Sequence, residues 1–330
     1  MPRRLLYVMD PMEGVLVDKD TTFAFQLEGQ RRAHEQYHCL ARDLFVARTV
    51  PHARVRRLHV EQTAPYFGLE DAREVPLTFF DVVLMRKDPP FDMAYVFATH
   101  LLELVDRAVT FVMNAPRGLR DANEKLYALH FPDLIPPSLV SSDQARLKAF
   151  MGELGGDMIL KPLDGAGGAG VFHLRVGDRN VNAILESLTR DGTRLVMGQQ
   201  YLPAARAGDK RVIVLDGTPI GAVLRIPRED ETRGNIHVGG RVAAAHVDER
   251  DREICGRLAP RLAADGLHFV GLDVIGGLVT EINVTSPTGV QEIDRLADVS
   301  LESQVLDFIE TRAAGLDRSD AQRETAVSSR

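Results

Sequence analysis

Apolar positions in the first third of the chain follow two patterns, short continuous runs and longer segments with helical spacing. The runs predict buried strands at residues 5–9, 81–85 and 110–113, and the helical spacing predicts helices at 21–36 and 94–107. Strands that alternate with helices form parallel sheets with helices on both faces. This part of the sequence therefore predicts an α/β unit that binds ligands beyond the carboxyl ends of its strands.

Polar residues follow each of these predicted strands. Asp10 follows the first strand, the segment 86–90 (RKDPP) follows the second, and Asn114 follows the third. Because the carboxyl ends of parallel strands lie at one edge of the sheet, we expect these side chains to face a common crevice. Solvated turn residues are the alternative interpretation of each segment. That alternative gives Arg86 and Lys87 no structural task.

From about residue 123 onward, the pattern changes to strands connected in hairpins. Strands are expected at 194–200, 210–215 and 219–226, and a helix is expected at 249–264, before two C-terminal helical segments. Residues 227–241 (PREDETRGNIHVGGR) carry charges and glycines without a packing pattern. Loops of this length are typical of lids, so we expect this one to be mobile without ligands.

A glycine-rich segment at 161–170 (KPLDGAGGAG) matches the pattern G-x-G-x-x-G at Gly165, Gly167 and Gly170. In dinucleotide-binding folds this motif leads from a strand into a helix, whose N-terminus holds the pyrophosphate. Here the apolar runs at 158–163 and 171–176 predict a strand on each side. The glycines are therefore expected in a strand-to-strand turn, where backbone N–H groups can still hold a phosphate.

The strongest local signal lies in a predicted hairpin around Gly276-Gly277, with strands at 267–275 and 278–284. Glu281 and Asn283 are two residues apart on one strand, so they share a face. A two-residue turn sets Asp273 on the opposite face, whereas a three-residue connection with a bulge sets it across from Glu281. We predict the second arrangement. The three side chains then offer hard oxygen ligands suited to Mg²⁺, and the alternative is a solvent-facing strand with polar residues.

Composition and charge narrow the classes of protein. A chain of 330 residues, 45% hydrophobic and 26% charged, is long enough for two or three packed units. The net charge of −7 argues against a nucleic-acid partner. Cys39 and Cys255 lie far apart, which indicates neither a disulfide framework nor a zinc site. No apolar run approaches the length of a signal or membrane segment, so we expect a cytoplasmic protein without a membrane partner.

Short motifs occur in a fixed order between residue 5 and residue 312. They are MDP (9–11), LMRKDPPFD (84–92), NEKL (123–126), ILKPLDGAGG (159–168), GDKR (208–211), RIP (225–227), ETRGN (231–235), GGR (239–241), FVGLDVIG (269–276) and TEINVTSPT (280–288). In this order the chain resembles the prokaryotic glutathione synthetases of the ATP-grasp superfamily. It departs from them at Ala166, where a methionine is expected, and at Gly289, where a cysteine is expected. Neither change removes a charge, so both affect packing more than chemistry.

The resemblance implies a fold and a division into domains. The fold is α/β, with an N-terminal doubly wound parallel sheet, the pre-ATP-grasp domain, followed by the α+β subdomains of the ATP-grasp. The implied units are an N-terminal substrate domain (1–122), an ATP-grasp lid subdomain with the glycine loop (123–200), a C-terminal ATP-grasp subdomain with the metal site and the large loop (201–314), and a flexible tail (315–330). The family also suggests a homotetramer.

The resemblance further implies that the enzyme couples γ-glutamylcysteine to glycine. ATP phosphorylates the cysteinyl carboxylate, and the glycine amine then displaces phosphate from the acyl phosphate. Such chemistry depends on positioning and charge neutralisation, so it needs cations more than a nucleophilic side chain. Arginine suits this task because its guanidinium binds a phosphate or carboxylate edge with two parallel hydrogen bonds.

Motif matching then gives each site residue an implied role. Those expected at ATP are Lys125, Lys161, Gly165, Gly167, Gly168, Gln199, Gln200, Tyr201, Leu202, Lys210 and Asn235. The residues expected to act on the acyl phosphate are Arg211 and Arg225, with Arg233 on the lid. Those expected at γ-glutamylcysteine are Arg86, Asn114 and Ser286. Asp273, Glu281 and Asn283 are expected to hold Mg²⁺ or Mn²⁺.

Two alternatives stay open. Another ATP-grasp carboxylate–amine ligase, of the D-alanine ligase or glutamate-adding type, would share the phosphate and metal parts, but the segments 86–90 and 285–288 match the glutathione enzyme instead. A nucleotide-binding regulatory module without turnover would be expected to have lost residues such as Asp273 or Arg211, and these are present.

Overall fold

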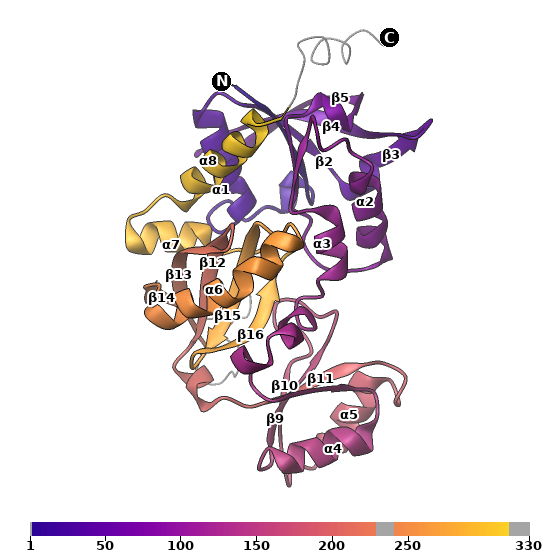
Figure 1. Cartoon of the computed structure of the whole chain (residues 1–330), viewed down its shortest axis with the longest axis vertical. Coiled ribbons are helices and arrows are strands. Elements are labelled where there is room, and N and C mark those ends of the chain that lie inside the picture. Colours follow the sequence, from indigo (N-terminus) through magenta and orange to yellow (C-terminus); the bar gives the residue numbers. More distant parts are fainter. Residues whose placement is uncertain (1, 229–240, 317–330) are drawn as a thin grey trace.

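The computed structural model describes residues 2–228 and 241–316, and these residues form three sheets (Figure 1). The predictions for Arg233, Asn235 and most of the loop 227–241 lie outside the described residues, as does the predicted tail beyond residue 316. No helix in the described part is long and apolar enough to cross a membrane.

The first sheet lies in the N-terminal part of the chain. Its strands are β1 (Arg4–Val8), β2 (Glu35–Cys39), β3 (Leu44–Ala47), β4 (Val50–Val60), β5 (Phe67–Pro76), β6 (Val82–Met85) and β7 (Phe111–Met113). Strands β2, β1, β6 and β7 run parallel side by side, and β3, β4 and β5 extend the sheet with antiparallel pairs. The predicted α/β fold is therefore confirmed, but the sheet is mixed rather than wholly parallel.

Helices pack against this sheet, and its central strands β1 and β6 are consequently buried along most of their length. They are α1 (Thr21–Arg31), α2 (Met93–Glu103) and α3 (Pro116–Asp121). Asp20 caps α1 by accepting a 2.7 Å hydrogen bond from Phe23 N, and Asp92 caps α2 in the same way. These caps explain why both helices begin close to their predicted starts.

The predicted helix at 21–36 is too long. Helix α1 ends at Arg31, Ala33 has a φ of 58°, and the chain then enters β2. Strand β2 carries the buried polar residues Gln36 and His38, which bond to Tyr7 Oη and to the Asp10 carbonyl. Buried polar residues do not give the apolar run by which a parallel strand is recognised, so the sequence pattern missed β2.

The second sheet has the order β10-β9-β11-β8 and contains the glycine loop. Its strands are β8 (Ser138–Ser141), β9 (Asp157–Pro162), β10 (Phe172–Arg175) and β11 (Val196–Gln200), covered by α4 (Gln144–Glu153) and α5 (Val181–Thr189). Strands β9 and β10 are antiparallel, so the glycines lie in a strand-to-strand turn as predicted. Gly167, Gly168 and Gly170 have φ values of 62°, 79° and 72°, a conformation that residues with a Cβ rarely adopt.

The third sheet has the order β14-β13-β12-β15-β16. Its strands are β12 (Asp209–Leu215), β13 (Thr218–Ile226), β14 (Arg241–Ala245), β15 (Phe269–Ile275) and β16 (Leu278–Asn283), and the helices are α6 (Glu249–Ala264), α7 (Val290–Ala297) and α8 (Leu301–Ala314). The bounds of α6 match the prediction. Helix α8 returns to the first unit and packs on α1 (Figure 1), where Arg32 forms ion pairs with Asp307 and Glu310.

Short 3-10 helices connect these elements. They are η1 (Met12–Gly14), η2 (Ala41–Asp43), η3 (Leu77–Phe79), η4 (Tyr127–His130), η5 (Pro132–Leu134) and η6 (Pro203–Arg206).

The register of the β15–β16 hairpin is the one that was predicted. Asp273 pairs with Glu281, and the register shifts between Asp273 and Val274. The connection itself is shorter than predicted, because Ile275 pairs with Leu278 across a two-residue turn of Gly276 and Gly277. The extra residue lies in β16 instead. This bulge brings Asp273 and Glu281 to the same face of the sheet.

Candidate active site

Two cavities adjoin the β15–β16 hairpin. The lysine cavity, of about 130 Å³, is lined by Lys125 and Lys161 and lies between the second and third sheets. The arginine cavity, of about 480 Å³, is lined by Arg211 and Arg225 and extends toward the N-terminal unit. Both cavities are lined by Gly167, Asp273 and Glu281. A ligand group at this shared wall is therefore accessible from both sides.

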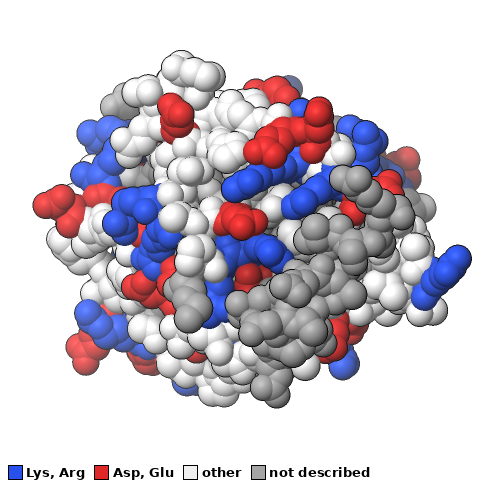
Figure 2. Space-filling model, turned by 90° about the horizontal axis from the view of Figure 1, so that it is seen from above, with Lys and Arg blue, Asp and Glu red and all other residues white. Residues whose placement is uncertain are grey.

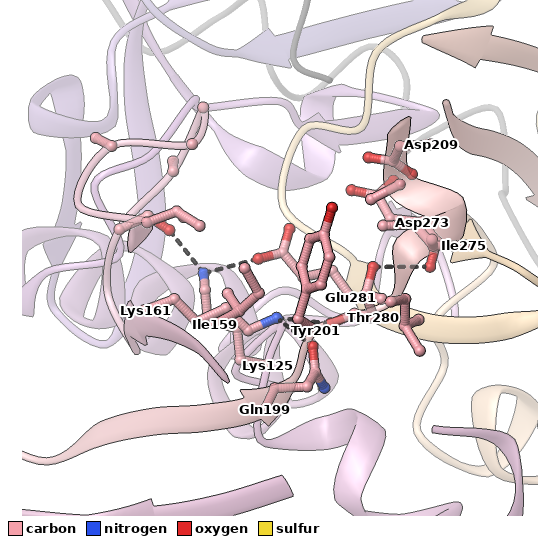
Figure 3. A pocket seen from close by; sticks show the side chains of 18 of the residues that line it. Lys125, Ile159, Lys161, Gln199, Tyr201, Asp209, Asp273, Ile275, Thr280 and Glu281 are labelled. Carbon is pink, nitrogen blue, oxygen red and sulfur yellow. Dashed lines mark hydrogen bonds and ion pairs between the residues drawn. The ribbon is translucent and has the colours of Figure 1, made fainter. Parts of the chain in front are cut away.

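The two lysines point into the same space beneath the glycine loop (Figure 3). Lys125 Nζ donates a 2.7 Å hydrogen bond to the Gly165 carbonyl and lies 3.1 Å from Glu281 Oε1. Lys161 Nζ donates to Gln199 Oε1 at 3.1 Å and to the Thr280 carbonyl at 3.0 Å. Burial lowers the pKa of Lys161, and although the Glu281 and Asp273 carboxylates oppose this and Lys125 adds to it, the net shift is downward. An anionic ligand in this cavity would stabilise the charged form.

One part of the wall of the lysine cavity is apolar and partly aromatic. It includes Ile159, Val171, Tyr201, Leu202 and Ile275, with Gln200 beside them. The Tyr201 ring stacks on His173 with a centroid separation of 3.9 Å, which fixes the ring plane. An apolar slot beside two buried ammonium groups suits a flat base joined to phosphates.

The glycine loop and Gln199 complete this cavity. Gly165, Gly167 and Gly168 all line it. Gln199 Nε2 donates to Ser138 Oγ at 2.9 Å, while its Oε1 accepts from Lys161. Both ends of the amide are therefore in use, and Gln199 holds the Lys161 side chain in place.

Lys210 does not reach the cavity, which corrects the prediction that it binds ATP. Its Nζ lies 2.6 Å from Asp248 and 2.8 Å from Asp251, at the start of α6. Successive side chains on a strand point to opposite faces. Asp209 and Arg211 therefore face the cavities, and Lys210 between them faces the helix.

In the arginine cavity, two guanidinium groups hold Asp273. Arg211 Nε donates to Asp273 Oδ1 at 2.6 Å and its Nη2 donates to Oδ2 at 3.2 Å, while its Nη1 donates to the Thr288 carbonyl at 3.0 Å. Arg225 Nη2 lies 2.9 Å from Asp273 Oδ2 and also pairs with Asp209. Burial alone raises the pKa of Asp273, but the adjacent Arg211 and Arg225 lower it below its usual range. Asp273 is therefore held as a carboxylate.

The donors expected to hold a divalent cation fit that task. Asp273, Glu281 and Asn283 all line the arginine cavity. Asn283 Nδ2 donates to the Gly271 carbonyl at 3.3 Å, so its amide oxygen is not needed for that bond. In the described part of the chain, no three His, Cys, Asp or Glu side chains are arranged to hold a metal by themselves. Two carboxylates and one amide oxygen suit a hard cation that shares phosphate and water ligands.

The expected crevice at the strand ends of the first sheet is partly confirmed. Lys87 Nζ lies 2.9 Å from Asp10 Oδ1, and Asp88 N donates to Asp10 Oδ2 at 3.0 Å. Arg86 does not share this crevice. It is 4% exposed, and it donates to Thr22 Oγ1 and to the Pro287 carbonyl, each at 3.0 Å. Arg86 therefore joins the N-terminal unit to the segment after β16, rather than lining the cavity expected to hold substrate.

Asn114 also bonds to the backbone of the protein itself. Its Nδ2 donates to the carbonyls of Phe269 at 2.8 Å and Val284 at 3.1 Å, and its Oδ1 accepts from Phe269 N at 2.8 Å. The side chain is thus fully used in tying β7 to β15. Of the three residues expected at γ-glutamylcysteine, Ser286 is the one that lines the arginine cavity.

Sequence reasoning missed four acidic residues that line the two cavities. They are Asp209 in the lysine cavity and Asp20, Glu124 and Glu292 in the arginine cavity. Burial raises the pKa of Asp209 to about 6 and also raises that of Glu124, which accepts a 3.0 Å bond from Thr285 Oγ1. Asp209 and Glu124 stand in the GDKR and NEKL motifs, which could have signalled them. No motif marks Asp20 or Glu292.

The face of the molecule seen from above has no single sign of charge (Figure 2). Figure 2 shows Lys and Arg side chains interspersed with Asp and Glu on the face seen from above. Such mixing gives no continuous basic surface on that face.

The fold matches that of a solved synthetase. A D-cycloserine synthetase superposes with a TM-score of 0.64 at 17% identity, over 93% of this chain and 99% of that one. At this identity the likeness shows a shared fold. The class of protein, an ATP-grasp enzyme, is shown by the model of a glutathione synthetase ATP-grasp domain that matches the part of the chain with the glycine loop, the buried lysines and the Asp/Glu/Asn hairpin.

Sequence comparisons then identify the family. The model of the prokaryotic glutathione synthetase N-terminal domain matches residues 4–120, and the model of its ATP-grasp domain matches residues 124–298. The glutathione synthetase of Gloeobacter violaceus is 48% identical over 312 residues, which cover 93% of this chain and 96% of that protein. That of Salmonella typhimurium is 47% identical over 94% of this chain and 99% of its own. The chain belongs to the prokaryotic glutathione synthetase family.

Proposed function

We propose that the protein joins γ-glutamylcysteine to glycine, with conversion of ATP to ADP and phosphate, to form glutathione. Its membership of the family, across nearly the whole chain, supports this activity. The observation that carries the chemistry is the wall shared by the two cavities at Asp273 and Glu281. A phosphoryl group placed there can pass from a nucleotide in the lysine cavity to a carboxylate in the arginine cavity.

ATP occupies the lysine cavity in this proposal. Lys125 and Lys161 bind its phosphates, and the glycine loop covers them with backbone N–H groups. The base lies in the apolar slot beside Tyr201 and Leu202, with Gln200 at its edge. Gln199 acts through Lys161, because its amide is already bonded on both sides.

The family uses ATP with a divalent cation, and we propose Mg²⁺ or Mn²⁺ here. Asp273, Glu281 and Asn283 are the residues that would hold it, because their oxygens line the cavity beside the expected phosphates. When bound, such a cation neutralises charge on the transferring phosphoryl group.

The reaction has two steps, and the arginines beside Asp273 stabilise the negative charge that develops in them. A cysteinyl carboxylate oxygen attacks the terminal phosphorus of ATP, the bond to ADP breaks, and an acyl phosphate forms. Arg211 and Arg225 lie where negative charge develops, and their bonds to Asp273 fix them there before substrate arrives. The glycine amine attacks the acyl carbon and loses a proton, and phosphate leaves as the peptide bond forms.

The domain boundaries and the assembly state belong to the same proposal. We place the units at 1–122, 123–200 and 201–314, which keeps each sheet within one unit. A cytoplasmic homotetramer is part of the same proposal, and exposed apolar residues on α2 and at its C-terminal cap offer a surface for contact between subunits. Met93 and Phe97 are each 60% exposed, and Leu104, seven residues after Phe97, is 54% exposed on the same side.

The test is an assay of purified protein with ATP, Mg²⁺, γ-glutamylcysteine and glycine. We expect one phosphate and one tripeptide for each ATP consumed. Replacement of both substrates by D-alanine, or by glutamate and a peptide acceptor, should give neither product. Phosphate release with those substrates, but not with γ-glutamylcysteine and glycine, would assign the chain to another ATP-grasp ligase.

A further inference from the structure

The arginine cavity is also lined by residues to which the proposed reaction assigns no role. They are Lys19 and Asp20, from the loop before α1, and Glu292, from the first turn of α7. These residues come from opposite ends of the sequence. The cavity at this point therefore lies between the N-terminal unit and the C-terminal helices.

Glu292 is a buried carboxyl group that lacks a partner for one of its oxygens. The residue is 4% exposed, and no group in the described residues hydrogen-bonds to its Oε2. The nearby guanidinium of Arg295 donates instead to the Asp18 carbonyl at 2.6 Å. Burial raises the pKa of Glu292, as expected for a carboxyl group without a bound cation. A polar atom left this way costs free energy, which a bound donor would recover.

Asp20 also lines this cavity, and its side chain is fixed. Its Oδ1 accepts from Phe23 N at 2.7 Å, which holds the carboxylate at the start of α1. Burial raises the pKa of Asp20, and the Asp88 carboxylate adds to this, while the bond from Phe23 N and the charge of Arg86 lower it by less; the hydrogen bonds of Arg86 go to Thr22 and Pro287. Asp20 is thus a second carboxyl group, held in position without an ion pair among the described residues.

The two carboxyl groups are also fixed relative to each other. Gln291 Nε2 donates to the carbonyls of Asp20 at 2.6 Å and Val17 at 3.1 Å, and Val290 N donates to Thr21 Oγ1 at 3.4 Å. These bonds attach the start of α7 to the loop that carries Asp20. A site held by its own scaffold needs little rearrangement to bind a ligand.

We propose that Asp20 and Glu292 bind the α-ammonium group of the γ-glutamyl residue, with Lys19 beside its α-carboxylate. The inference rests on the proposed function, because γ-glutamylcysteine carries an amino-acid zwitterion at the end opposite its reacting carboxylate. With that carboxylate at Arg211 and Arg225, the other end of the molecule extends along the cavity to Asp20 and Glu292. The ammonium of glycine is a poorer candidate, because its nitrogen must reach the acyl carbon beside the arginines.

Substrate analogues isolate the two charges of the zwitterion. Glutaryl-cysteine lacks the α-amino group, and 4-aminobutyryl-cysteine lacks the α-carboxylate. For Glu292→Gln, we expect the KM for γ-glutamylcysteine to rise roughly 10- to 100-fold, as for a lost charge-assisted hydrogen bond, with KM for ATP and glycine unchanged. With glutaryl-cysteine the wild type should already show the weaker binding, and Glu292→Gln should add nothing to it.

Two further variants control this experiment. Asn caps a helix about as well as Asp, so Asp20→Asn keeps the start of α1 and removes the charge. It should raise the KM for γ-glutamylcysteine and not that for glutaryl-cysteine. Glu302→Gln is the matched control, because Glu302 Oε2 is a buried carboxyl oxygen to which no group among the described residues hydrogen-bonds by geometry, although Asp294 lies beside Glu302, and the residue lies on α8, outside the arginine cavity. It should leave every KM unchanged.

Other outcomes would overturn the inference. An equal penalty from Glu292→Gln with γ-glutamylcysteine and with glutaryl-cysteine would show a purely structural role. A rise confined to the KM for glycine would assign the two carboxyl groups to the other substrate. A wild-type protein that makes no tripeptide from γ-glutamylcysteine would instead refute the proposed function, whatever the variants do.

Discussion

The lysine cavity and the arginine cavity both contain buried cationic side chains, but the partners of those side chains differ. Lys161, Arg211 and Arg225 are similarly buried, at 5%, 6% and 5% exposure, so burial does not distinguish them. Their partners do. Lys161 donates to an amide oxygen and a backbone carbonyl, whereas both arginines pair with the Asp273 carboxylate.

This difference indicates what each cavity contributes. An ammonium with neutral partners is poorly compensated, so an arriving polyanion gains a strong interaction with it. A guanidinium already paired with a carboxylate gains less from binding, but its position is fixed in advance. We infer that the lysine cavity supplies nucleotide affinity and the arginine cavity supplies rate.

The largest effect is expected from Arg211→Lys. A lysine cannot span both oxygens of Asp273 and the Thr288 carbonyl, so kcat should fall roughly 100- to 1,000-fold, while the Kd for ATP should change by no more than about threefold. Single-turnover phosphate release and calorimetry measure the two quantities. Arg257→Lys, at an exposed ion pair with Asp133, serves as the control. A loss of ATP affinity as large as the loss of kcat would contradict the division between the cavities.

A smaller effect, on affinity, is expected from Lys161→Met. The Kd for ATP should rise roughly 30- to 100-fold, because a charged hydrogen bond to phosphate is lost from a dry site. Calorimetry without γ-glutamylcysteine measures it, and Lys148→Met, at an exposed position on α4, is the control. Unchanged nucleotide affinity would refute the assignment.

The same lysine gives a pH dependence. The charged form binds phosphate, and burial lowers the pKa of Lys161 in the free protein. As the pH rises, Lys161 loses its proton and ATP affinity falls. This fall should therefore begin at a pH below the ordinary lysine pKa of about 10.4. In Lys161→Met this step should be absent, and its persistence in the variant would point to another group.

The smallest effect is expected from Lys210→Met, one residue away from Arg211. The change leaves the buried Asp251 without its cation and should destabilise the fold by about 1–2 kcal/mol, which lowers Tm by roughly 2–4 °C. ATP affinity should stay within twofold of the wild type. Scanning calorimetry measures the Tm, and nucleotide titration measures the ATP affinity. Weaker ATP binding at an unchanged Tm would show that Lys210 takes part in binding ATP.

Prediction from sequence succeeded where local pattern and chain geometry agreed. The apolar runs located β1, β6, β7 and β9, and α6 was found with its observed bounds. It failed between residues 37 and 80, where β3, β4 and β5 were not predicted. Strand β4 alternates buried apolar positions with Arg and His, and such alternation is a weaker signal than a continuous run. Its pairing with β5 and β2 makes up for what the local pattern lacks.

The residues of the site can also be divided into those predicted from the sequence and those placed only by the fold. The sequence by itself located the glycine loop and the hairpin with Asp273, Glu281 and Asn283, because each lies within one short segment, and motif resemblance located the two lysines. The bulge in β16 that sets Asp273 across from Glu281 was decided in the folded sheet. The tertiary structure decided that Arg86, Asn114 and Lys210 bond to the protein itself, and that Asp20 and Glu292 line one cavity. The physical reason is that a partner's identity depends on contacts between distant segments, about which the pattern along the chain carries no information.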